Sequence, residues 1–156
     1  MPMHAEKRVL PYTPEQLFEL VRNVENYPEF LPWCQALRIR RREATETGEI
    51  LVADMVIGFK VFRERFTSRV EAYPTGKDGS TVPRIDVAYT EGPFKFLNNH
   101  WVFNAVEGGT EIDFFVDFEF RAKILEKAIG VVFNEAVQKM VNAFETRATK
   151  IYGNTN

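Results

Sequence analysis

Few residues of this chain have the side chains and spacing that covalent or metal catalysis requires. Its serines are Ser68 and Ser80, its histidines are His4 and His100, and none falls in a nucleophile-elbow or zinc-helix motif. The lone cysteine, Cys34, follows a tryptophan, and a cysteine in such apolar surroundings is more often inert than paired with a base. The histidines lack metal-ligand spacing. We therefore predict no catalytic residue and no metal site.

Glu64 is the charged residue in the least expected position. The alternation of a predicted strand places it between Phe62 and Phe66 on the apolar face. In a cavity it would need a partner or a raised pKa, and it would then hydrogen-bond a polar ligand head or act as a general base. The alternative is an ion pair with an arginine at the open end of the sheet, which we favour because isolated buried carboxylates are costly.

A cluster of arginines forms a second candidate site. Acidic residues are interspersed with it, a pattern typical of a solvated sheet face. The alternative, which would give these arginines a function, is a surface that binds anionic lipid head groups or ribosomal RNA. The arginines are Arg38, Arg40, Arg41, Arg42, Arg63, Arg65 and Arg69.

Large apolar side chains give the strongest signal, since the chain has 14 Phe and is 45% hydrophobic. On the pattern, many of them project between a sheet and a helix, where an apolar pocket would suit a hydrophobic small molecule. With Glu64, the predicted ligand-binding residues are Tyr27, Phe30, Leu31, Trp33, Phe62, Phe66, Phe94, Trp101, Phe114, Phe118, Phe133, Val137 and Met140.

A long C-terminal helix, residues 122–152, is the element that must cover this sheet. The stretch has no proline, and its apolar residues recur at spacings of three and four. They are Leu125, Ile129, Val132, Phe133, Ala136, Val137, Met140, Val141, Phe144 and Ala148. Such a wide stripe would either close a core completely or leave a cleft against a curved sheet.

Before the sheet, the sequence predicts a first strand over residues 4–12 and two short helical segments. Thr13 is the expected N-cap of the first helix, with Pro14 at its first position, Gln16 completing a capping box and Asn23 at its end. In the segment YPEFLPWC, residues 27–34, two prolines limit the second helix to a short turn over residues 24–31. This segment either plugs one end of the sheet or forms the mouth of a pocket.

The remaining strands are predicted over residues 36–43, 49–59, 60–72, 84–90, 99–106 and 110–120. Gly48 and Gly58 are expected at turns, residues 73–83 form a loop, and Gly92-Pro93-Phe94 breaks the chain between two strands. This order predicts an α+β helix-grip fold, a curved antiparallel sheet of about seven strands wrapped around the long helix. Because a curved sheet cannot contact a straight helix along its whole length, we expect a tunnel between them.

Length and charge bound the class of protein. The 156 residues are expected to form a single domain, 1–156, large enough for a core without disulfides. The net charge of −2 argues against a surface devoted wholly to nucleic acid. No apolar run reaches the length of a membrane span, and the N-terminus lacks a signal-peptide core. We expect a cytoplasmic bacterial protein or a trimmed mature form, with peripheral contact at the inner membrane face.

Several motifs together resemble the START-like polyketide cyclase/dehydrase superfamily, and more closely its coenzyme Q-binding branch, which also contains the bacterial ribosome-association toxin. The motifs are YPEFLPWC, the FTSRV strand end, the EGPFKFLNNHWVF run and the FxVDFEF strand before the long helix. The family positions fall on Tyr27, Pro28, Phe30, Leu31, Pro32, Trp33, Cys34, Gly92, Pro93, Phe94, Leu97 and Trp101. The resemblance implies a START domain with a deep hydrophobic cavity that carries ubiquinone for respiration or quinone biosynthesis.

We therefore predict a non-enzymatic carrier for a hydrophobic small molecule, with ubiquinone (coenzyme Q) as a bound ligand and not a redox cofactor. The cavity would hold the isoprenoid tail and part of the ring, bordered at its entrance by YPEFLPWC and the Gly92-Pro93-Phe94 loop. Transient contact with a membrane surface or respiratory complexes would follow. The rivals are a ribosome-binding factor that uses the arginine cluster, and a polyketide cyclase or aromatase with an acidic cavity around Glu64.

Overall fold

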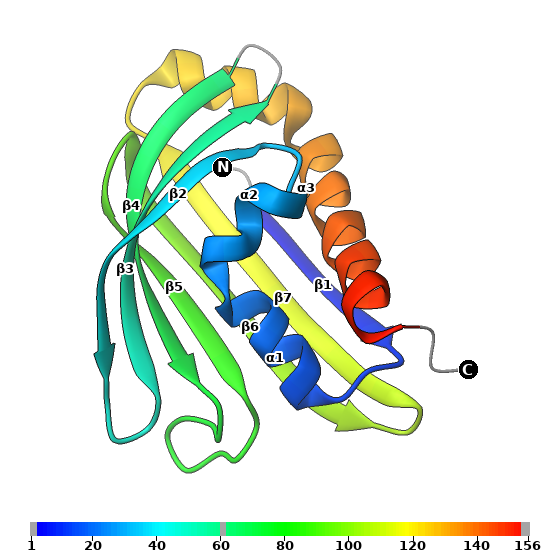
Figure 1. The fold of residues 1–156 in the computed structure, drawn as a ribbon. Helices are drawn as coiled ribbons and strands as arrows, with labels where there is room; N and C mark the ends of the chain where they lie inside the picture. Colours follow the sequence, from blue (N-terminus) through cyan, green and yellow to red (C-terminus); the bar gives the residue numbers. More distant parts are fainter. Residues whose placement is uncertain (1–2, 60–61, 154–156) are drawn as a thin grey trace.

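The computed structural model describes residues 3–59 and 62–153, and over these residues the chain forms one seven-stranded sheet and a set of helices (Figure 1). The sheet order is β1-β7-β6-β5-β4-β3-β2, and every neighbouring pair is antiparallel. This confirms the predicted α+β helix-grip fold. In chain order the elements are β1 (Met3–Leu10), α1 (Pro14–Arg22), η1 (Val24–Asn26), α2 (Tyr27–Phe30), β2 (Cys34–Ala44), β3 (Glu49–Phe59), β4 (Phe62–Tyr73), β5 (Arg84–Glu91), β6 (Phe94–Val106), β7 (Gly109–Phe120) and α3 (Lys123–Tyr152).

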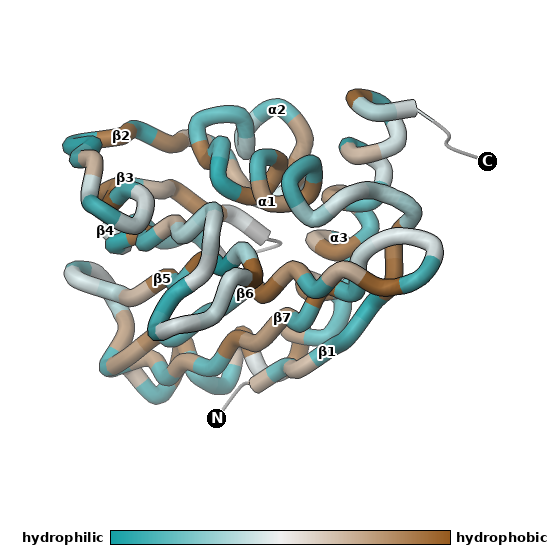
Figure 2. The backbone as a smooth tube through the Cα atoms, turned by 90° about the horizontal axis from the view of Figure 1, so that it is seen from below, coloured by the Kyte–Doolittle hydropathy of each residue, from teal (hydrophilic) through white to brown (hydrophobic). Residues whose placement is uncertain are grey.

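The sheet is strongly curved, and its concave side receives the helices. Seen from below, the strands curl around α1, α2 and α3 (Figure 2). Register shifts interrupt the pairing of β2 at residues 39–41, of β4 at residues 67–68 and of β6 at residues 94–96. Because an extra residue in one strand bends it and increases its twist, these irregularities accompany the curvature.

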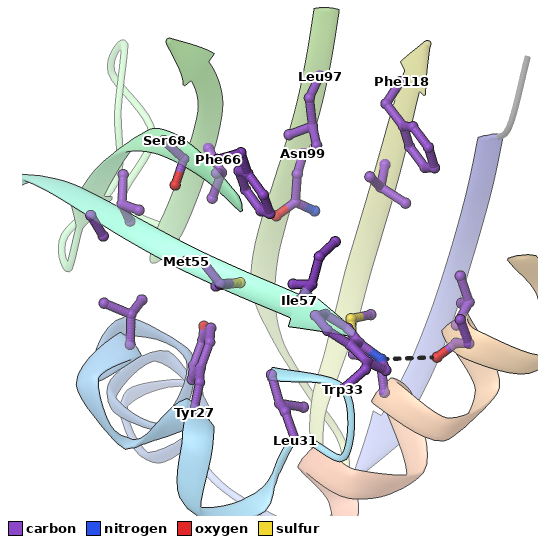
Figure 3. A pocket seen from close by; sticks show the side chains of 18 of the residues that line it. Tyr27, Leu31, Trp33, Met55, Ile57, Phe66, Ser68, Leu97, Asn99 and Phe118 are labelled. Carbon is purple, nitrogen blue, oxygen red and sulfur yellow. Dashed lines mark hydrogen bonds between the residues drawn. The ribbon is translucent and has the colours of Figure 1, made fainter. Parts of the chain in front are cut away.

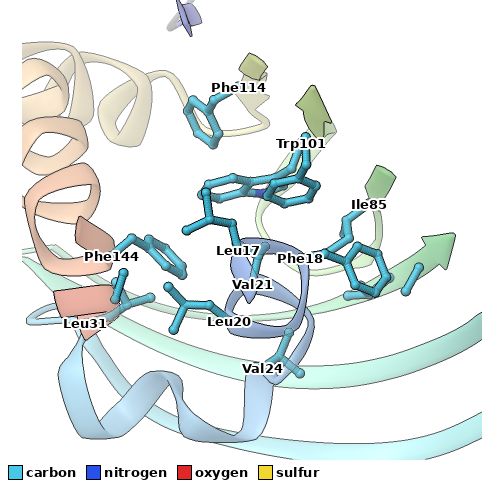
Figure 4. Packing of buried hydrophobic residues seen from close by; sticks show 14 of the residues in the cluster. Leu17, Phe18, Leu20, Val21, Val24, Leu31, Ile85, Trp101, Phe114 and Phe144 are labelled. Carbon is cyan, nitrogen blue, oxygen red and sulfur yellow. The ribbon is translucent and has the colours of Figure 1, made fainter. Parts of the chain in front are cut away.

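Helix α1 forms where the capping residues predict it. The Thr13 Oγ1 accepts a hydrogen bond from the Gln16 amide at 3.1 Å, and the Gln16 Oε1 accepts one from the Thr13 amide at 2.9 Å. Both free amides at the helix start are thereby satisfied. Its apolar face packs into one end of the sheet, in one cluster with Ile85 and Trp101 of the sheet and Phe144 of the C-terminal helix α3 (Figure 4). The buried residues of that face are Leu17, Phe18, Leu20 and Val21.

Apart from shifts of one or two residues at strand ends, two features differ from the prediction, namely the start of β6 and the place of Gly58. Strand β6 begins at Phe94 instead of Asn99, because the chain beyond the predicted break pairs with the end of β7, where Phe94 lies opposite Phe120. Gly58 lies within β3 and not at a turn. A Cβ at this glycine would meet the flexible end of the Gln35 side chain, whose Nε2 lies 2.2 Å from the Cβ position, so Gln35 would have to shift to accommodate a larger residue. The predicted start of β4 at residue 60 lies outside the described residues.

Helix α3 contacts the sheet unevenly. Its buried residues are Ile129, Val137, Phe144 and Ala148, whereas Phe133, Ala136 and Met140 of the predicted stripe are only half-buried. A helix seated flush on a sheet would bury the whole stripe. Space therefore remains under the middle of α3. Within residues 3–59 and 62–153, none of the helices is long and apolar enough to cross a membrane.

Candidate functional site

A cavity of about 220 Å³ lies between the concave side of the sheet and the helices. Side chains from β2 to β7 and from every helical element face it, and most of them are aliphatic or aromatic (Figure 3). This volume exceeds the ~150 Å³ of an engineered apolar cavity that stays dry and binds benzene. The expected tunnel is thus present as an apolar hollow large enough for a substituted ring.

One end of the cavity is lined by an aromatic cluster beneath α1 and the C-terminal half of α3. Trp101 meets Phe114 edge-on, with ring centroids 4.6 Å apart, and lies 5.1 Å from Phe144. Tyr27 also meets Phe144 edge-on, with ring centroids 5.4 Å apart. These rings belong to the larger of two separate clusters of buried apolar residues.

The second cluster lines the other end, around Phe94 at the start of β6. Its ring stacks on Phe120 at 4.8 Å and meets Phe66 and Phe118 edge-on at 5.4 and 5.6 Å. Gly92 makes this approach possible, because it has φ +137° and a Cβ there would lie 2.7 Å from the Phe66 Cβ. The core is thus divided into two aromatic clusters, and the cavity runs between them.

The segment 27–34 forms a wall of the cavity. Tyr27, Leu31 and Trp33 all line it. The Trp33 indole reaches α3, where its Nε1 donates to the Ala136 carbonyl at 3.4 Å (Figure 3), and the Gly58 amide donates to the Trp33 carbonyl at 2.8 Å. Trp33 therefore joins the segment to the long helix on one side and to β3 on the other.

Two titratable groups of this segment are held neutral. Burial raises the pKa of Tyr27 far above its usual range, and the Tyr27 hydroxyl donates a hydrogen bond to the Val21 carbonyl. Burial also raises the pKa of the Cys34 thiol to about 11. At neutral pH this thiol is protonated and, being 4% exposed, it is poorly suited to nucleophilic attack.

The structure brings most of the predicted binding residues to the cavity wall. Those that line it are Tyr27, Leu31, Trp33, Phe66, Phe94, Trp101, Phe114, Phe118, Phe133, Val137 and Met140. Phe30 does not line it; its ring packs on Phe144 at 5.2 Å and lies 5.1 Å from the Arg147 guanidinium. The short helix α2 turns Phe30 toward α3. The Phe62 side chain lies outside the described residues.

Glu64 also does not line the cavity. Its backbone lies directly opposite Ile57, which lines the cavity from β3. On β4 itself the last cavity residue before the β3–β4 turn is Phe66, and Glu64 lies two residues beyond it and is half-buried. Among the described residues it forms no ion pair with an arginine either. Within the described part of the chain, Glu64 therefore neither faces the cavity nor pairs with an arginine, the two alternatives that the sequence offered.

Two polar residues of the cavity wall were not predicted as binding residues. Ser68 and Asn99 face the hollow from β4 and β6 (Figure 3). The alternation of Phe66, Ser68 and Val70 along one strand places Ser68 on the same face as two apolar cavity residues, and this is the signal by which it could have been predicted. Asn99 alternates with Leu97 and Trp101 in the same way.

The convex face of the sheet carries the arginine cluster, much of it in ion pairs. Asp54 accepts from Arg38 at 3.0 Å and lies 3.5 Å from Arg40. A hydrogen bond from the Thr67 hydroxyl at 2.6 Å, aided by these two arginines, lowers the pKa of the Asp54 carboxyl. Thr67 itself is buried, at 6% exposed. For the exposed Arg41, Arg63 and Arg65, no ion pair is formed within the described part of the chain.

A curved antiparallel sheet that grips a long helix over an apolar hollow defines a helix-grip fold of the START type. The sequence agrees, because residues 10–145 match the family described as polyketide cyclase/dehydrase and lipid transport. The chain belongs to this family.

Two curated relatives cover nearly the whole chain. Ribosome association toxin RatA of Rickettsia prowazekii is 38% identical over 144 residues, which cover 92% of this chain and 94% of the relative. The mitochondrial coenzyme Q-binding protein COQ10 homolog B of Xenopus laevis is 30% identical over 155 residues, which cover 96% of this chain and 59% of the relative. A relative named for ribosome association and a relative named for coenzyme Q binding are thus both similar to this chain over more than nine-tenths of its length.

Solved structures agree on the fold. The solution structure of the 18 kDa protein CC1736 from Caulobacter crescentus has a TM-score of 0.79 and 34% identity, covering 99% of this chain and 100% of that one. The Zhui aromatase/cyclase from Streptomyces sp. R1128 has a TM-score of 0.75 at 15% identity, covering 96% and 95%. At that identity the second likeness concerns the fold alone.

Proposed function

We propose that this protein is a non-enzymatic carrier that binds a hydrophobic small molecule in the cavity, with ubiquinone or a related isoprenoid as the ligand. The observation that carries the proposal is the apolar hollow of about 220 Å³ between two aromatic clusters. Apolar burial would supply the affinity, at roughly 25 cal/mol per Å² removed from water. A relative named as a coenzyme Q-binding protein supports the choice of ligand.

Catalysis is not part of the proposal. Acid–base chemistry needs a titratable side chain, such as a carboxylate, histidine, lysine, tyrosine or cysteine, within reach of the substrate. Tyr27 is the one described cavity residue with a strongly displaced pKa, and its proton is committed to the Val21 carbonyl. A cyclase that depends on Glu64 is less favoured, because that carboxylate does not face the hollow.

The chain offers a direct assay for binding, since both of its tryptophans, Trp33 and Trp101, line the cavity. Titration with a short-tailed ubiquinone such as decylubiquinone should quench tryptophan fluorescence with saturation. Organic extraction and mass spectrometry of protein from a quinone-producing host should recover quinone. Absence of both saturable quenching and bound lipid would reject the carrier proposal.

Exchange with a membrane would use the first half of α3. Ile124 and Val131 are 77% and 86% exposed there, and Lys127 lies between them on the same helical face. Lys123 precedes Ile124, so cations flank the apolar pair. Apolar side chains beside lysines suit an anionic lipid surface.

Vesicle sedimentation tests this surface. The wild type should sediment with vesicles that contain phosphatidylglycerol and less with pure phosphatidylcholine. Val131→Asp should reduce sedimentation, whereas Val106→Asp, at a 39% exposed position at the end of β6, should not. Equal sedimentation of the two variants would contradict the assignment.

A second candidate function, association with ribosomal subunits, is favoured by the relatives named RatA. Arg41, Arg63 and Arg65 would supply phosphate contacts, because they are exposed on the convex face of the sheet. Binding through phosphate contacts weakens steeply with salt. Sedimentation with purified subunits at rising salt, compared between wild type and Arg65→Gln, tests it; salt-independent binding, or none, would argue against this surface.

A further inference from the structure

Five cavity residues carry a hydrogen-bonding side chain, namely Tyr27, Trp33, Ser68, Asn99 and Trp101. Four of them are engaged with protein. Tyr27 and Trp33 donate to carbonyls, and the Trp101 Nε1 donates to the Asn99 Oδ1 at 3.0 Å. The Asn99 Nδ2 donates to the Phe115 carbonyl at 2.7 Å.

Ser68 is the exception. The residue is 4% exposed, yet within the described part of the chain its hydroxyl has no hydrogen-bond partner. The Ser68 Oγ is not among the fully buried side-chain atoms that lack a partner, so it is reached from the cavity and not enclosed by protein. Val70, two residues along the same face, offers the cavity no such donor.

The neighbours of Ser68 leave room for a ligand atom beside it. Directly opposite on β3 lies Ala53, which also lines the cavity, so two small side chains stand together among large ones. On the neighbouring strand β5, Ser68 pairs with Tyr89, whose hydroxyl donates its hydrogen bond to the Gly92 carbonyl. Asn99 keeps one amide proton beyond its bond to Phe115.

We propose that Ser68 forms a polar subsite of the cavity and donates a hydrogen bond to an oxygen on the ligand's ring, such as a quinone carbonyl. The inference rests on the proposed carrier function and refines it. A hollow of about 220 Å³ holds a substituted ring but not a long isoprenoid chain as well. The ring therefore lies inside, near Ser68, and the tail runs outward, which reverses the arrangement expected from the sequence.

Two ligands and two variants test this subsite. Decylubiquinone carries ring oxygens, whereas decylbenzene has a ring and the same tail length without oxygen. Ser68→Ala should weaken decylubiquinone binding about 3- to 10-fold, the effect of one hydrogen bond, and leave decylbenzene binding equal or tighter. Ser68→Thr, which keeps the hydroxyl, should retain the preference for the quinone.

The possible outcomes separate the inference from the function on which it rests. Equal weakening of both ligands by Ser68→Ala, or no weakening of either, would overturn the subsite while the carrier function stands. A wild type that binds neither ligand would overturn both. Should Ser68→Ala fold poorly, infrared spectra of carbonyl-labelled quinone bound to the wild type provide the test. A downward shift of the carbonyl stretch relative to apolar solvent supports the hydrogen bond, and an unshifted band refutes it.

Discussion

Filling the cavity from within should remove ligand binding without unfolding the protein. Val137 lies on α3, is 5% exposed and lines the hollow. Val137→Phe adds four carbon atoms. Since a cavity of ~150 Å³ holds the six carbons of benzene, the new ring would occupy about 100 Å³ of the available 220 Å³. Too little space would then remain for a substituted ring.

The stability of this variant can be worked from the same volume. Residual cavities cost about 24 cal/mol per Å³, so the whole hollow costs about 5 kcal/mol, and filling 100 Å³ would recover about 2 kcal/mol at most. Strain from imperfect fit costs about 1–3 kcal/mol in return. The free energy of unfolding should therefore stay within about 2 kcal/mol of the wild-type value.

Urea unfolding and tryptophan quenching by decylubiquinone measure the two quantities on the same sample. We expect at least tenfold weaker binding with a nearly unchanged unfolding midpoint. Val9→Phe, at a 55% exposed position on β1, is the matched control and should bind as the wild type does. Loss of more than about 3 kcal/mol in Val137→Phe would mean that the space is packed core, and unchanged binding would mean that the ligand lies elsewhere.

Three further predictions concern the frame of the site. Thr110→Val should lower the free energy of unfolding by about 1–3 kcal/mol in urea titrations, because the fully buried Thr110 hydroxyl donates to the Tyr12 carbonyl at 2.6 Å. Gly92→Ala should cost about 1–3 kcal/mol or more and weaken quinone binding, since its φ of +137° is strained for alanine and its Cβ would press on Phe66; wild-type melting and binding would contradict this. Asp54→Asn should be less stable than the wild type at pH 7. The folded-state pKa of Asp54 is lowered, so its contribution is present above the unfolded pKa and is lost as the pH falls through the folded value; in urea titrations the deficit should shrink below about pH 4.

Local chemistry explains which parts of the fold were predictable. Helix α1 was placed correctly because Thr13 and Gln16 act within one turn of each other. The alternation of β7 likewise depends on nothing outside the strand. The start of β6 was wrong because its first residues are held by pairing with the distant end of β7, where Phe94 lies opposite Phe120. The residues around Phe94 alone do not show that they pair with a strand more than twenty residues away.

The same distinction applies to the site. Alternation correctly brought Phe66, Trp101 and Phe118 to the cavity. It failed for Phe30, whose direction depends on how the four-residue helix α2 meets Arg147 on α3. It failed for Glu64 because the sequence gives the face of a residue but not how far along the strand the cavity extends.

The two candidate functions use opposite faces of the same strand. In β4 the side chains of Phe66, Ser68 and Val70 face the cavity, while Arg65 and Arg69 are exposed on the convex side. Successive residues of a strand point to opposite faces, so a change on one face leaves the other nearly intact. Relatives named for a ribosome and for a quinone are therefore physically compatible within one fold. A cavity variant such as Val137→Phe and a surface variant such as Arg65→Gln should separate the two activities, because neither alters the surface that the other tests.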